Sequence, residues 1–332
     1  MTTRRVLVVA AAALAFACGG GSEPSAPATT NDGVAGDIRK DAAGWVEYTI
    51  GDTPLIISAP HGGSLAPSSL PDRTCAACVT VTDDNTELLA RRVAALFMAR
   101  TGKRVHLVIN LLKRAKFDPN REVVEATGGN GVLVASWTFY HQAIESARAR
   151  ITTSPGRGLL LDLHGHGHAI ARLELGYLLS ASDLRLSDQQ LATANLMATT
   201  SIARLAIVAV DHPTPAALLR GTTSLGAILV RNGYPSVPSP TDLAPGVNDE
   251  YFSGGYITER HGSLAGGTVD GIQIEANRTG VRDTPENVEK YASAIVSTTL
   301  EYLSAHYGWM PAARTTAVRA SAVRATAVPA AF

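Results

Sequence analysis

The sequence has few of the features that mark a nucleic-acid-binding or membrane-spanning chain. Its 29 basic and 29 acidic residues cancel to a formal net charge of zero, and no long basic run occurs, so nucleic acid is not expected as a partner. The apolar run from Val6 to Ala17 is too short to cross a bilayer as a mature helix. The 332 residues, 45% of them hydrophobic, are enough for one large α/β domain or two small ones.

Cysteine is also scarce, and the first of the three cysteines belongs to a stretch typical of export. Arg4 and Arg5 precede the apolar run, which ends at Cys18. This stretch resembles a bacterial lipoprotein signal, so we expect residues 1–17 to be removed, Cys18 to be lipidated and residues 18–40 to form a disordered linker. An ordinary cleaved secretory signal is the alternative. Both interpretations place the protein outside the cytoplasm, and the first anchors it to a membrane from the periplasm or at the outer membrane.

The other two cysteines, Cys75 and Cys78, are too few for a four-sulfur zinc site. Pro71 and Asp72 mark the surrounding segment as a loop. In an oxidising compartment we expect the pair to form a local disulfide that stiffens this loop. A thioredoxin-like redox role is the weaker alternative.

The strongest signal in the sequence is an apolar run that ends in histidines. Residues 158–163 read Gly-Leu-Leu-Leu-Asp-Leu and indicate a strand buried on both faces, as at the centre of a parallel sheet. His164, His166 and His168 follow, separated by glycines, at the strand end where open α/β sheets bind ligands. Asp162 lies on the same strand face as His164. We therefore expect at least one functional histidine here.

A second strand ends in a similar way. Residues 45–50 and 54–58 are predicted to form a hairpin, and His61 follows it with two glycines. Two such tips in one α/β chain favour a shared site. Further along, Asp83 and Asp84 precede a helical pattern; one is expected to cap that helix, which leaves the other for chemistry.

The remaining pattern is that of an alternating α/β chain. The last helix is predicted to start at Pro285, since proline is favoured at a first helical position, and to end at Gly308. Strands are expected over 104–112, 174–180, 254–258 and 271–275, a helix capped by Ser136, a helix running into a strand over 187–210, a short helix over 225–230 and a disordered tail over 311–332.

In this order, the segments resemble the N-formylglutamate amidohydrolase family, a branch of the zinc carboxypeptidase and aspartoacylase superfamily. The matching blocks are Pro60-His61-Gly62-Gly63, Asp83 with Thr86, Asp118-Pro119-Asn120-Arg121, Tyr140-His141, Asp162-Leu163-His164, Gly254-Gly255-Tyr256-Ile257-Thr258 and Gln273-Ile274-Glu275. The resemblance implies a three-layer α/β/α sandwich with a mixed, mostly parallel central sheet of the zinc carboxypeptidase type. We expect this catalytic domain to cover residues 41–310.

The resemblance also implies a zinc ion as cofactor. His61, Asp83 and His164 would be its ligands, with Asp84 as the alternative carboxylate. Two imidazoles and one carboxylate leave a tetrahedral position open for water, as a catalytic zinc requires. Glu275 would be the general base.

Substrate-binding roles follow from the same blocks. Asn120 and Arg121 match the motif that holds a substrate carboxylate, and a guanidinium can grip both carboxylate oxygens. Arg278 is expected as a further substrate-binding residue. Asp162 would orient a ligand histidine from behind, and His141 is expected to be a hydrogen-bonded packing residue.

The function expected from these residues is zinc-dependent hydrolysis of the C–N amide bond of an N-acyl amino acid, N-formyl derivatives included, or of a similar small carboxylate. A small molecule or a short peptide would be the substrate. One alternative is an exported zinc carboxypeptidase or peptidoglycan amidase. The other is a non-catalytic surface lipoprotein that binds a ligand on the same fold, against which the retention of both histidines, an aspartate and Glu275 argues.

Overall fold

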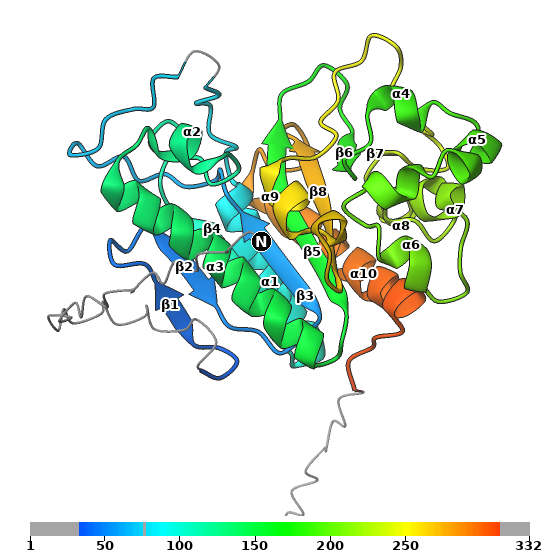
Figure 1. The fold of residues 1–332 in the computed structure, drawn as a ribbon, viewed down its shortest axis with the longest axis horizontal. Helices are drawn as coiled ribbons and strands as arrows, with labels where there is room; N and C mark the ends of the chain where they lie inside the picture. Colours follow the sequence, from blue (N-terminus) through cyan, green and yellow to red (C-terminus); the bar gives the residue numbers. More distant parts are fainter. Residues whose placement is uncertain (1–32, 76–77, 313–332) are drawn as a thin grey trace, which may run out of the picture.

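The computed structural model describes residues 33–75 and 78–312, and its centre is an eight-stranded sheet (Figure 1). The strands lie in the order β1-β2-β4-β3-β5-β8-β6-β7. Their bounds are β1 Ile38–Lys40, β2 Val46–Thr49, β3 Leu55–Ala59, β4 His106–Asn110, β5 Gly158–His166, β6 Leu173–Gly176, β7 Ser236–Val237 and β8 Val269–Asn277. The four central strands β4, β3, β5 and β8 are parallel, and β2 and β6 flank them in antiparallel register.

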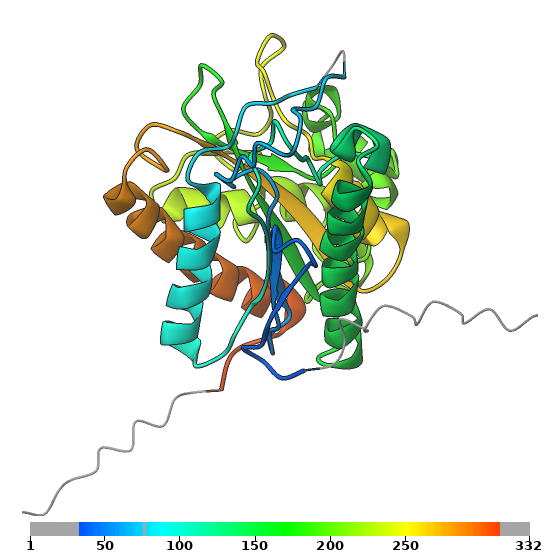
Figure 2. The same ribbon diagram turned by 90° about the vertical axis from the view of Figure 1, so that its left-hand side faces the viewer.

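Helices cover both faces of this sheet. Helices α1 (Thr86–Thr101) and α10 (Pro285–Tyr307) pack together on one face, and α3 (Gly131–Thr153) and α9 (Tyr256–His261) cover the other (Figure 2). The expected α/β/α sandwich with a mixed sheet is therefore confirmed.

Shorter helices fill in the margins, most of them beside the β6–β7 edge in Figure 1. Their bounds are α2 Val123–Thr127, α4 Ala181–Leu184, α5 Asp188–Thr193, η1 Leu196–Thr199, α6 Leu205–Val208, α7 Pro215–Arg220, α8 Leu225–Arg231 and η2 Ser263–Ala265. None of the helices in the described ranges combines the length and the hydropathy of a bilayer-spanning segment.

The alternation of side chains along β5 explains why its sequence is apolar throughout. Leu159, Leu161 and Leu163 pack into the core under α1 and α10, whereas Leu160 packs into the core under α3. All four are almost fully buried. A strand covered on both sides buries every apolar side chain, and the next polar positions on the α3 side are Asp162 and His164.

Several local expectations were wrong. The segments 45–50 and 54–58 are both strands but not a hairpin, because β4 lies between β2 and β3. Helix α3 is capped by Asn130 rather than Ser136, whose buried hydroxyl donates to Asp41.

The region 187–210 contains short helices and no strand, and the segment 254–258 leads into helix α9. The range 18–40, expected as a disordered linker, includes strand β1, so the folded part begins before residue 41. The signal segment, residues 18–32 of the linker, and residues 313–332 of the tail lie outside the described residues.

Asp270 gives a test of this fold at the opposite end of β8 from Glu275. It is almost fully buried at the start of β8, where it accepts hydrogen bonds from Ser263, the Leu205 amide and Tyr307. Burial raises the pKa of Asp270 to about 6, although its hydrogen bonds oppose that shift.

Since the folded state holds this proton more tightly than the unfolded chain, the free energy of unfolding should fall as pH rises from about 4 to about 6, by about 1.4 kcal/mol for each unit between the two pKa values. The variant Asp270→Asn should lack this part of the fall. Denaturant unfolding of both proteins between pH 4 and 7 measures it, and parallel curves would contradict the assignment.

Candidate active site

Two glycines let His61 approach its partners from the end of β3. A Cβ on Gly62 would lie 2.2 Å from the Glu87 amide nitrogen, and one on Gly63 would lie 2.2 Å from the Leu111 carbonyl carbon. The tip after β3 is thus wedged between the start of α1 and the segment after β4. The Asp83 amide donates to the His61 carbonyl at 3.0 Å, which brings the Asp83 carboxylate beside the imidazole.

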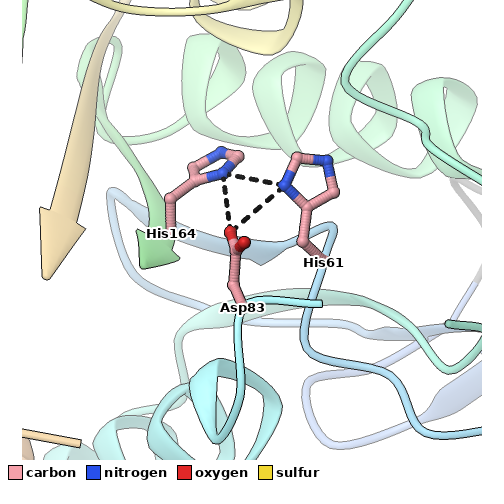
Figure 3. Close-up of side chains that lie close together, drawn as sticks. All are labelled: His61, Asp83 and His164. Carbon is pink, nitrogen blue, oxygen red and sulfur yellow. Dashed lines mark hydrogen bonds and ion pairs between the residues drawn. The ribbon is translucent and has the colours of Figure 1, made fainter. Parts of the chain in front are cut away.

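His164 completes a group of three side chains that point toward one another (Figure 3). The Nδ1 atoms of His61 and His164 are 3.1 Å apart. Asp83 Oδ2 lies 3.2 Å from Nδ1 of His61 and 3.4 Å from Nδ1 of His164. All three side chains are buried.

A carboxylate stands behind each imidazole. His61 Nε2 lies 2.6 Å from Asp118 Oδ1, and His164 Nε2 lies 2.7 Å from Asp162 Oδ2. An ionised carboxylate only accepts hydrogen bonds, so each Nε2 carries a proton and donates it. In the neutral imidazoles the lone pair is then on Nδ1, directed at the other two members of the group.

This arrangement requires positive charge, which a proton on His164 or a bound metal ion can supply. Two Nδ1 lone pairs and a carboxylate oxygen at about 3 Å repel one another in a buried site unless such charge lies between them. Burial alone would lower the pKa of His164, but Asp162, Asp83 and Glu275 raise it well above its ordinary value. Burial alone would raise the pKa of Asp83, but His61 and His164 lower it far below its ordinary value.

The three atoms fit a metal ion in particular. A tetrahedral zinc ion with bonds of about 2.0–2.2 Å holds its ligand atoms roughly 3.3–3.6 Å apart, close to the 3.1–3.4 Å seen between these atoms. The carboxylates behind the imidazoles are the partners that orient metal-binding histidines in proteins. His61, Asp83 and His164 are thus well suited to bind a divalent metal.

Glu275 lies next to this group on the neighbouring strand. It pairs with His164 across the β5–β8 ladder, and its Oε1 is 3.9 Å from His164 Nδ1. Oε1 accepts from Gln273, while Oε2 has no hydrogen-bond partner among the described residues. Burial raises the pKa of Glu275 to about 8; His164 opposes the shift, and Asp83 and Glu174 add to it.

A cavity of about 110 Å³ opens onto these side chains. Asn120 and Arg121 line it together with His61, His164 and Glu275. The Oδ1 atom of Asn120 is held by the Ile257 amide, which fixes the orientation of the side chain. Arg121 is partly exposed and pairs with Glu125 through Nε.

Two residues of the site were not identified in the sequence. Arg114 lines the cavity and forms ion pairs with Asp118 at 2.9 Å and with Asp83 at 3.7 Å. Asp118, which orients His61, lies in the same sequence block as Asn120 and Arg121, and that block was the available signal. Arg114 lies in a charge-dense segment, residues 113–122, where no sequence pattern distinguishes it from a solvated charge.

The structure also places the remaining predicted residues. Asp84 is exposed, whereas Asp83 is the aspartate that lies with His61 and His164. Arg278 does not line the cavity and instead lines a separate surface pocket with Asp84. Helix α1, which follows Asp83 and Asp84, has Asn85 at its N-cap position, and the Asn85 side chain makes no capping hydrogen bond. Neither aspartate therefore caps this helix.

Cys75 and Cys78 are joined as a disulfide, with their Cα atoms 5.2 Å apart. Cys18 lies outside the described residues. His141 is buried between the Pro119 carbonyl and His261, which in turn contacts Glu145, so it supports the loop that carries Asn120.

His166 and His168 form a second group with Glu174. The ring nitrogens of His166 are both occupied, one by the Arg172 carbonyl and the other by the His168 amide. His168 Nδ1 lies 2.8 Å from Glu174 Oε1. This second group is satisfied by its own hydrogen bonds and does not line the cavity.

Comparisons with known proteins give structural likeness only. No protein-family model and no curated protein sequence matches the chain. An N-formylglutamate amidohydrolase from Ralstonia eutropha JMP134 is similar at 15% identity over 77% of this chain and 95% of that one, with a TM-score of 0.46. An N-acetylmuramyl-L-alanine amidase from Mycobacterium abscessus is similar at 14% identity over 75% of this chain and 98% of that one, with a TM-score of 0.36. A succinylglutamate desuccinylase from Chromobacterium violaceum is similar at 11% identity over 86% of this chain and 77% of that one, also with a TM-score of 0.36.

The group formed by His61, Asp83 and His164 predicts that two adjacent aspartates differ in their effect on zinc affinity. Asp83→Ala removes one of three ligand atoms and should lower the affinity for zinc by at least about 100-fold, since even the groups behind the ligands contribute 10–100-fold. Asp84→Ala removes an exposed carboxylate outside the group and serves as the matched control. Competition with a chelator measures both affinities, and equal affinities in the two variants would rule out Asp83 as a ligand.

Proposed function

We propose that this protein is a zinc-dependent hydrolase that cleaves the C–N amide bond of an N-acyl amino acid. One observation carries the proposal: three lone-pair atoms of His61, His164 and Asp83 converge beside a buried Glu275 with a free carboxylate oxygen. Ligand atoms next to an acid–base group are the elements of metal-assisted hydrolysis. A binding protein has no need of the second element.

The acid–base chemistry falls to Glu275. A bound zinc ion supplies Lewis acidity and lowers the pKa of water to about 7. The Glu275 carboxylate accepts the proton of the attacking water and then donates it to the departing amine nitrogen as the C–N bond breaks. A group that must both accept and donate a proton works best with a pKa near the working pH, and burial raises the pKa of Glu275 in that direction.

Substrate binding falls to Asn120 and Arg121. Arg121 can pair with the substrate carboxylate, and the Asn120 amide, fixed by its bond to the Ile257 amide, offers a second donor. Arg114 pairs with Asp118 and Asp83, so its charge supports the residues proposed to bind the metal. These donors favour a small substrate with one carboxylate close to the scissile amide.

The signal-like N-terminus favours a second candidate. An exported protein anchored through Cys18 meets cell-wall peptides rather than cytoplasmic metabolites, which would suit a zinc carboxypeptidase or a peptidoglycan amidase. Both candidates use the same residues and differ in the length of the substrate. Assays of the zinc-loaded protein on N-acyl amino acids and on muropeptides separate them.

The variant Glu275→Gln tests the proposed chemistry. Glutamine keeps the shape and the bond from Gln273 but cannot take a proton, so kcat should fall by roughly 10²–10⁴-fold while zinc content and melting temperature stay close to those of the wild type. The exposed Glu250, changed to glutamine, is the control. Near-normal kcat in Glu275→Gln with a lowered melting temperature would show a structural role instead.

A further inference from the structure

Two sequence features have no part in the proposed chemistry: the disulfide loop at Cys75–Cys78 and the pair His166 and His168. Each lies next to an apolar side chain of the cavity. Val79, directly after the disulfide, and Phe252, next to His168, both line it. They remain 44% and 43% exposed, respectively, so both have surface left for a ligand to cover.

Phe252 is held in place from several sides. Its amide donates to Glu174 at 2.8 Å, and the other oxygen of this fully buried carboxylate holds His168. The Phe252 ring stacks on the His168 ring, with centroids 4.6 Å apart and planes at 27°. The segment is also fixed by Tyr251, whose hydroxyl donates to the Leu175 carbonyl. The ring is therefore a fixed wall.

Val79 is anchored by a buried arginine. Arg73 donates to the Val79 carbonyl at 2.6 Å and to the Arg114 carbonyl at 3.0 Å, and it also contacts Asp118, the residue that orients His61. The disulfide loop is thus tied to the frame of the active site. This connection holds the Val79 side chain beside the cavity.

The size of the cavity indicates that Val79 and Phe252 contact the outer part of a substrate, away from the reacting amide. At about 110 Å³ the cavity is smaller than the roughly 300–1,000 Å³ of most small-molecule pockets, so it has room for little more than the reacting amide and its carboxylate. Atoms further from the amide then lie at the rim, against exposed Val79 and Phe252.

The charges around the cavity disfavour a second carboxylate. Among the described residues that line it, the basic side chains besides histidine are Arg114 and Arg121. Arg114 already compensates Asp83 and Asp118, and Glu275 adds a further acidic group. An acidic side chain that packed against Val79 and Phe252 would lose hydration without gaining a free cation, which is unfavourable.

We propose, on the basis of the hydrolase function above, that the substrate is an N-acyl amino acid with one carboxylate and an apolar, preferably aromatic, side chain that packs against Phe252 and Val79. Aromatic rings gain from offset or edge contacts beyond the burial of area. An acidic amino acid, such as the glutamate implied by the family resemblance, is then a poor substrate.

The test compares phenylalanine, alanine and glutamate, each as its N-formyl and N-acetyl derivative, with the zinc-loaded protein. We expect kcat/KM for the phenylalanine derivative to exceed that for glutamate by about 10-fold or more, the scale of discrimination by apolar contacts. In Phe252→Ala the ratio of phenylalanine to alanine should fall about 10-fold, and Phe252→Leu should keep most of it. Val247 is 81% exposed, lies five residues before Phe252 and does not line the cavity. The control variant Val247→Ala should therefore keep the wild-type ratio.

The outcomes separate two kinds of failure. If the protein cleaves glutamate derivatives as well as phenylalanine derivatives, or if Phe252→Ala keeps the wild-type ratio, the apolar wall is wrong and the hydrolase remains. If none of these amides is cleaved by the zinc-loaded protein, the proposed hydrolysis of N-acyl amino acids fails, and the substrate class fails with it.

Discussion

The convergence of two imidazole lone pairs and a carboxylate oxygen is the constraint on which the rest of the site depends. Such a group is unstable in a buried place unless a proton or a metal ion supplies positive charge, and the chain provides His61, His164 and Asp83 from three different segments to build it. Asp118 and Asp162 fix the tautomers that direct the lone pairs inward. The parallel centre of the sheet supplies the rigid base, because β3 and β5 are neighbours and end at the same edge.

The second layer of the site connects this group to the loops around it. Arg114 and Arg73 pair with Asp118, and Arg73 also holds the loop that carries Val79. On the other side, the buried Glu174 pairs in register with Glu275 and holds Phe252. The same buried ion pairs and hydrogen bonds that orient His61 and His164 thus place the side chains at the rim, so the proposed metal ligands and the proposed substrate contacts depend on one network.

The sequence predicted the parts of this arrangement that follow from strand patterns. The apolar run before His164 and the glycines after His61 placed both histidines at strand ends, and the resemblance assigned Asp83 and Glu275. Arg114 could not be predicted, because an ion pair across loops leaves no periodic signal. Asp118 lies in one of the matching sequence blocks, but its place beside His61 follows only from the fold. The position of β4 between β2 and β3 was missed for a related reason: which strands pair depends on packing between distant segments, and adjacent strands in sequence suggest a hairpin.

The most direct test of the metal group is a crystal structure of the zinc-loaded protein with anomalous diffraction at the zinc absorption edge. We predict one strong anomalous peak per chain, bonded to Nδ1 of His61, Nδ1 of His164 and Oδ2 of Asp83, with both Nε2 atoms still paired to their carboxylates. A structure grown with excess zinc that shows no peak among these three atoms would contradict the account.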